Sequence, residues 1–165
     1  MTLVERAELL TKNALRTLDR DVLYVALDAW QEAGYPDRAA RLHVDFTVKR
    51  ILPILEPFGR SLLRGPVRLV VSSPARPDAR EVARVVAIVP RSRPATGPRE
   101  AAFVTIAFLP ANDVWIVRTS IRGRRGRVKT FESEPLEDDY EVLADVARRF
   151  GNRGARGVYE QLLYL

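Results

Sequence analysis

The chain of 165 residues contains no cysteine and only one histidine, His43. The missing thiols exclude disulfides, thiolate metal sites and cysteine nucleophiles, and a single imidazole excludes multi-histidine metal sites. No apolar run approaches the roughly 18 residues that a membrane-spanning helix needs. The first residues also lack the basic stretch and apolar core of a signal peptide. We therefore expect no metal, no cofactor and no membrane partner, and a location in the cytoplasm or inside a virion.

Lysine and methionine are also scarce. Of 27 basic residues only Lys12, Lys49 and Lys129 are lysine, so 24 are arginine, and there is one methionine. This composition indicates a GC-rich or thermophilic source, a prokaryote or its virus. The 21 acidic residues leave a formal net charge of +6, a modest excess that favours a polyanionic partner such as nucleic acid.

The charges are unevenly distributed along the chain. Residues 1–65 carry a net charge of +1, residues 66–131 carry +9 and residues 132–165 carry −4. A codon bias acts along the whole chain, so by itself it does not produce a basic block followed by an acidic one. This segregation is the strongest functional signal in the sequence.

Residues 1–65 have the apolar spacing of three helices. Thr2 and Glu5 fit a capping box before the first helix. The second helix is expected to start after Asp19 or Asp21, and Gly34 is placed to end it. A third helix begins near Pro36, and we expect Pro53 to kink or end it.

After Pro66 the pattern changes to that of β-strands. Five segments are rich in Val, Ile, Phe and Thr and are separated by turn residues: 67–72, 82–90, 101–109, 114–121 and 127–132. No connection is long enough to hold a crossover helix, which predicts an antiparallel meander. The third strand is apolar on both faces, so we expect helices to cover both faces of the sheet.

Residues 133–165 return to a helical pattern. Acidic residues at the start of one helix and Arg148 and Arg149 at its end match the helix dipole, and a shorter helix follows at about 155–165. The prediction is an α+β protein with a helical N-terminal lobe (1–65), a basic sheet (66–132) and acidic C-terminal helices (133–165). A 65-residue helical lobe is marginal alone, so these parts are expected to share one core as a single domain.

Two arginine-rich loops give the basic block a geometry. In a meander, the loop between the second and third strands and the loop between the fourth and fifth emerge at the same end of the sheet. We expect this end to contact DNA or RNA phosphates without reading bases, since no base-reading motif is present. The predicted nucleic-acid-binding residues are Arg91, Arg93, Arg99, Arg122, Arg124, Arg125, Arg127 and Lys129.

The alternative function is self-assembly into a homo-oligomer, as a component of a virion or cellular complex. The acidic segment, residues 132–141, and the apolar C-terminus would then meet the arginine loops of a neighbouring subunit. The predicted subunit contacts are Glu137, Asp138, Asp139, Glu141, Leu162, Leu163 and Leu165.

Catalytic interpretations are weaker. Asp138 with Glu141 or Asp145 could share a helix face as a magnesium site, but acidic residues at a helix start are ordinary structural features. His43 and Asp45, two residues apart on a helix, do not face each other. No serine-nucleophile or nucleotide-binding motif is present. We therefore expect a non-catalytic protein with no small-molecule substrate.

Overall fold

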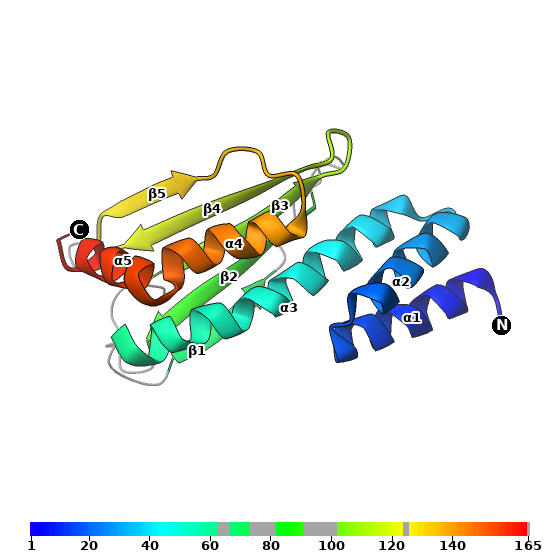
Figure 1. The fold of residues 1–165 in the computed structure, drawn as a ribbon, viewed down its shortest axis with the longest axis horizontal. Coiled ribbons are helices and arrows are strands. Elements are labelled where there is room, and N and C mark those ends of the chain that lie inside the picture. The colour runs from blue at the N-terminus through cyan, green and yellow to red at the C-terminus, as the bar shows by residue number, and fades with distance from the viewer. Residues whose placement is uncertain (63–66, 73–81, 91–101, 124–125, 165) are drawn as a thin grey trace.

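The computed structural model describes residues 1–62, 67–72, 82–90, 102–123 and 126–164 (Figure 1). Three helices precede a sheet and two helices follow it, so the fold class is α+β as predicted. No helix in the described part of the chain is long and apolar enough to cross a membrane. The elements are α1 (Leu3–Thr17), α2 (Arg20–Glu32), α3 (Pro36–Leu62), β1 (Val67–Ser72), β2 (Val82–Pro90), β3 (Ala102–Leu109), β4 (Val114–Arg122), β5 (Val128–Glu132), α4 (Asp139–Phe150) and α5 (Asn152–Tyr164).

The sheet is an antiparallel meander with the strand order β1-β2-β3-β4-β5. The tight turn after Leu109 joins β3 to β4, where the Asn112 N–H donates to the Leu109 carbonyl at 3.0 Å. Asp113 completes the turn with a φ of 48°, a left-handed conformation that aspartate tolerates better than most residues. The predicted strand bounds are confirmed to within one residue.

The start and end signals of the first helices are also confirmed. Thr2 accepts from the Glu5 N–H at 3.1 Å, and the Glu5 carboxylate accepts from the Thr2 N–H at 2.7 Å. Asp19 caps α2 through its side chain. Gly34 follows the end of α2 with a φ of 84°, a left-handed conformation that glycine adopts without the steric penalty of a Cβ.

Helix α3 continues through Pro53 and Pro57, so of the two expected effects of Pro53, a kink or an end, the end is wrong. Each proline removes one helical N–H donor. The two prolines lie four residues apart on the exposed side of the helix, where water can satisfy the freed carbonyls. The opposite side of α3 packs on the sheet, and this packing holds the helix together across both prolines.

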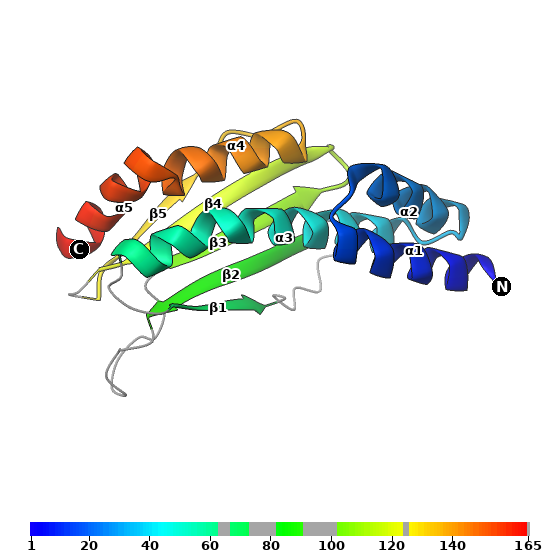
Figure 2. The ribbon, with the colours of Figure 1, turned by 60° about the horizontal axis from the view of Figure 1, so that its bottom comes forward.

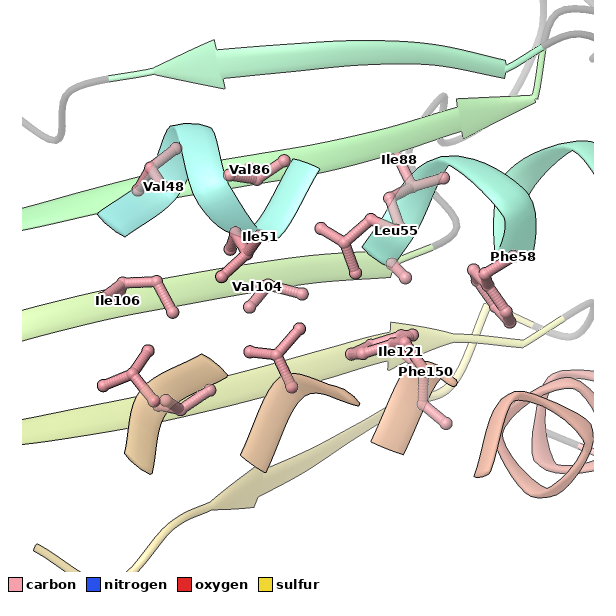
Figure 3. Packing of buried hydrophobic residues seen from close by; sticks show 14 of the residues in the cluster. Val48, Ile51, Leu55, Phe58, Val86, Ile88, Val104, Ile106, Ile121 and Phe150 are labelled. Atoms are coloured by element: carbon pink, nitrogen blue, oxygen red, sulfur yellow. The ribbon is translucent and has the colours of Figure 1, made fainter. Parts of the chain in front are cut away.

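One hydrophobic cluster fills the space between the sheet and the helices on it. Ile51, Leu55 and Phe58 of α3 lie over β2 and β3 (Figure 3). Phe150 of α4 packs edge-on against Phe58, with ring centroids 5.3 Å apart. Burying such a side chain contributes about 1.5–3 kcal/mol each, so this cluster is the main source of stability for the sheet layer.

A second hydrophobic cluster joins α1, α2 and the first half of α3. Leu23, Trp30 and Phe46 are its largest buried members. The Trp30 Nε1–H donates to Thr11 Oγ1 at 2.7 Å, which satisfies the one polar group of that ring. Because α3 belongs to both clusters, it connects the helical hairpin to the sheet. That the whole chain behaves as one domain stays a prediction.

The expectation that helices cover both faces of the sheet is wrong. Figure 2 shows α3, α4 and α5 on the same face, and no described helix lies on the other. The hairpin of α1 and α2 packs on α3 beyond the end of the sheet (Figure 1). An antiparallel sheet can leave one face to solvent. On the open face Phe103, Thr105 and Ile116 are only half-buried.

The close approach of α5 to the end of α4 requires a glycine at position 154 but not at position 157. A Cβ on Gly154 would overlap the carbonyl oxygen of Arg148 and lie 2.7 Å from that of Arg149, so a side chain there must displace backbone. Gly157, three residues later in the same helix, has nothing within 4 Å of its Cβ position. The same substitution should therefore have opposite effects at these two positions.

We expect Gly154→Ala to lower the free energy of unfolding by about 1–3 kcal/mol through overpacking. Gly157→Ala should raise it by up to about 1 kcal/mol, because alanine is the better helix former. Urea unfolding followed by circular dichroism measures both, and each variant is the control for the other. Equal effects of one sign would contradict the described approach of α5 to α4.

Candidate functional site

The antiparallel register brings two connections to one end of the sheet. Ala102 of β3 lies opposite Ile121 of β4, and Arg122 at the end of β4 lies opposite Val128 at the start of β5. The residues joining β2 to β3 and those joining β4 to β5 therefore leave the sheet at this end. The second connection closes through backbone hydrogen bonds between Gly123 and Arg127 at 2.9 Å and between Gly126 and Gly123 at 3.0 Å.

We name Arg122, Arg127 and Lys129 the basic end, because these predicted binding residues lie at this end of the sheet. Arg127 and Lys129 are exposed, and the Lys129 Nζ sits 4.9 Å from the Phe131 ring centroid. Arg122 is half-buried, and its Nε has no hydrogen-bond partner among the described residues. The other predicted binding residues, Arg91, Arg93, Arg99, Arg124 and Arg125, lie outside the described residues.

The acidic segment lies at the opposite end of the sheet. Leu136 forms a bridge with Trp115 near the start of β4, and α4 begins just after it. The exposed Asp138 caps α4 by accepting from the Glu141 N–H at 2.9 Å, and the Glu141 carboxylate accepts from the Glu137 N–H at 2.6 Å. These three predicted contact residues thus serve the helix start and remain at the surface.

The C-terminal contact residues are less well defined. Leu162 and Leu163 belong to α5, but their side chains lie outside the description, as does Leu165 altogether.

Asp139 was expected at a subunit contact, and this is wrong because its side chain is 1% exposed. Its carboxylate faces three basic groups from α2 and α3. Arg20 Nη1 lies 3.2 Å away, Arg50 Nη1 3.6 Å and His43 Nε2 3.5 Å. We name these four residues the Asp139 cluster. Because its partners belong to the same chain, Asp139 is not available to a neighbour.

Aromatic rings enclose the Asp139 cluster. The Arg20 guanidinium lies 3.6 Å from the Tyr140 ring centroid and donates to the Tyr24 hydroxyl at 2.6 Å. The His43 ring packs edge-on against Trp115, with centroids 5.0 Å apart. Trp115 is buried, whereas Tyr24 and Tyr140 are exposed, so the rings shield the ion pairs from water in part. The cluster thereby fastens α2 and α3 to the start of α4, a structural role.

Sequence reasoning missed the partners of Asp139. Asp45, considered in the sequence analysis as a partner of His43, forms an ion pair with Arg84 of β2 instead, with 2.5 Å between Asp45 Oδ1 and Arg84 Nε. His43 and Arg50 are seven residues apart and so share a face of α3, which the helical pattern could have indicated. Their link to Asp139 spans about a hundred residues of chain, and nothing local in the sequence indicates it.

Burial by itself would raise the pKa of Asp139, but the neighbouring His43 and the charge of Arg20 outweigh it and hold that pKa below its usual range. A carboxylate whose pKa is lowered by folding stabilises the fold above its unfolded pKa of about 3.9. That contribution is lost as the pH falls through the folded-state pKa.

Neither a metal-binding group nor a similar protein indicates a function for the described residues. Among the described residues, no group of three or more His, Asp or Glu side chains could hold a metal ion. Comparison with protein-family models, curated proteins and solved structures finds no match to this chain.

We expect Asp139→Asn to lower the free energy of unfolding at pH 7 by about 1–3 kcal/mol, because it removes the buried carboxylate that two half-buried arginines share. The exposed Asp28→Asn removes the same charge and is the control, with an expected change below about 0.5 kcal/mol. The difference in free energy of unfolding between wild type and Asp139→Asn should become smaller as the pH falls below about 4, because the wild-type carboxylate is then protonated. Urea unfolding at pH 7 and pH 3 measures this difference, and a difference independent of pH would contradict the ion-pair role.

Proposed function

We propose that this protein is a non-catalytic nucleic-acid-binding protein whose basic end contacts phosphates without reading base sequence. The observation that supports this proposal is the pairing state of its arginines. Nine described arginines of the helices and the sheet form ion pairs with carboxylates of the same chain: Arg6, Arg20, Arg38, Arg50, Arg60, Arg84, Arg118, Arg148 and Arg149. Arg41 on α3 and Arg156 on α5 are exposed and form no such pair within the described residues, so what distinguishes the basic end is that its unpaired cations lie together. Arg122, Arg127 and Lys129 form no ion pair with a described acidic residue.

An unpaired cation at the surface is solvated, but several at one end of a sheet create a positive potential that attracts polyanions. Guanidinium groups also match phosphate geometry through paired N–H donors, which suits arginine to this task.

The wide separation of the charge blocks supports the same proposal. The acidic start of α4 lies at the far end of the sheet, and its carboxylates serve caps and the Asp139 cluster. They therefore do not neutralise the basic end within one chain. A protein of this kind acts where nucleic acid is found, in the cytoplasm or in a virion, and it would accept DNA or RNA because only the backbone is contacted.

The same separation favours a second candidate function, head-to-tail self-assembly. The basic end of one copy carries positive charge, and the opposite end of the sheet carries the exposed carboxylates of Glu137 and Asp138. These two ends are complementary in charge, so one copy can bind the next head to tail. Such a heterologous contact builds rings or filaments. This candidate predicts a large mass in solution without nucleic acid, whereas phosphate binding does not.

The test compares two double variants that remove equal charge. Arg127→Gln with Lys129→Gln changes the basic end. The control variant, Lys12→Gln with Arg41→Gln, removes two exposed cations from α1 and α3. Binding to a short fluorescent duplex is measured by anisotropy across a salt series. Each phosphate contact contributes about 0.9 to the slope of log binding constant against log salt concentration, so the basic-end variant should lose about 1.8 of that slope and the control variant almost nothing.

Equal slopes for the two variants would contradict the proposal, since binding would then follow net charge alone. Light scattering on the same samples tests the second candidate. A wild-type oligomer that dissociates in the basic-end variant, with no duplex bound by either protein, would favour self-assembly instead.

A further inference from the structure

A cavity of about 180 Å³ lies between α5 and the β4–β5 side of the sheet. It is on the helix-covered face, and no predicted binding or contact residue lines it. The lining is mainly apolar and consists of Thr119, Ile121, Phe131, Arg149, Gly154, Gly157, Val158 and Gln161.

Two oxygen atoms of this lining are buried without partners. Thr119 is 2% exposed, and its Oγ1 has no hydrogen bond within the described residues. Gln161 Oε1 is in the same state. Buried polar atoms are almost always satisfied in folded proteins, so two such atoms around one cavity require a polar occupant. The hydroxyl of Thr119 can donate or accept, whereas the amide oxygen of Gln161 only accepts.

The cation within the lining has a carboxylate partner. The Arg149 Nε donates to Asp145 Oδ2 at 3.0 Å, and the exposed Arg148 shares the same carboxylate at 2.7 Å. Lys129 lies beside the Phe131 ring, but it is exposed to solvent and is not part of the lining. A charged occupant would lose its hydration without a dedicated counter-ion in the lining, so the lining favours a neutral one.

Size and lining set the rest of its chemistry. An apolar cavity of about 150 Å³ holds a benzene ring, so the space here suits a ring of similar size. Gly157 is exposed at the rim of this lining, and a Cβ there would have nothing within 4 Å, so a larger side chain can be accommodated at this position. A glycine inside a helix costs about 1 kcal/mol relative to alanine, and no described packing contact at Gly157 demands it.

We propose that this cavity is a binding site for a small neutral ring compound that carries a hydroxyl or amide N–H group. The ring packs against Ile121, Phe131 and Val158. Its polar group donates to Gln161 Oε1 and bonds the hydroxyl of Thr119. No residue of the basic end lines the site, although Lys129 lies beside its Phe131, and the proposal does not depend on the proposed nucleic-acid function.

Phenol is the probe, with benzene and benzoate as comparisons, in a titration followed by backbone amide NMR of the intact chain. Phenol should bind saturably, three- to tenfold more tightly than benzene, from one net hydrogen bond. Benzoate should bind more weakly than phenol because of its charge. The shifted signals should belong to residues of the lining.

Matched variants separate this site from non-specific binding. Thr119→Val should reduce the preference for phenol over benzene, because only the bond to Gln161 Oε1 remains, whereas Thr105→Val, the same change on the open face of the sheet, should leave that preference unchanged. Gly157→Leu should fill the cavity and abolish phenol binding. The proposal is overturned by the absence of saturable phenol binding, as a cavity holding only water would give. It is equally overturned by binding that survives Gly157→Leu, or by a phenol preference that Thr119→Val leaves intact.

Discussion

The packing of α3 on the sheet is the contact on which the rest of the structure depends. The first half of this helix forms a core with α1 and α2, and its second half forms the main core with β2 and β3. The helix crosses two prolines without breaking because they lie on its exposed side. Since α3 also carries His43 and Arg50, its position decides where the buried carboxylate of Asp139 finds its partners.

The Asp139 cluster and the basic end show two uses of the same residue type. Arg20 and Arg50 are half-buried and share the carboxylate of Asp139, so their charges hold elements together. Arg127 lies at the surface and forms no ion pair with a described acidic residue. The described arginines thus include some whose charge stabilises the fold and some whose charge faces solvent. Only the second kind supports a binding proposal.

The cavity beside Thr119 lies on the one face of the sheet that the helices cover. With α3, α4 and α5 all on one face, α5 must fit beside α4 over the β4–β5 edge. Gly154 permits the close approach of the two helices. The cavity therefore lies where α5 and the end of α4 meet β4 and β5, on the helix-covered face of the sheet.

The sequence by itself determined the elements of the described chain and their order. Capping residues, the change from helical to strand periodicity and the short connections are local features, and they fixed the antiparallel meander and the opposite placement of the two charge blocks. The tertiary structure alone decided which face of the sheet is covered, that Asp139 is buried and that a cavity opens beside Thr119. These depend on contacts between residues far apart in the chain, for which local periodicity carries no signal. The acidic run around Asp139 looks uniform in sequence, yet one of its carboxylates faces inward because helix geometry turns it towards Arg20 and Arg50.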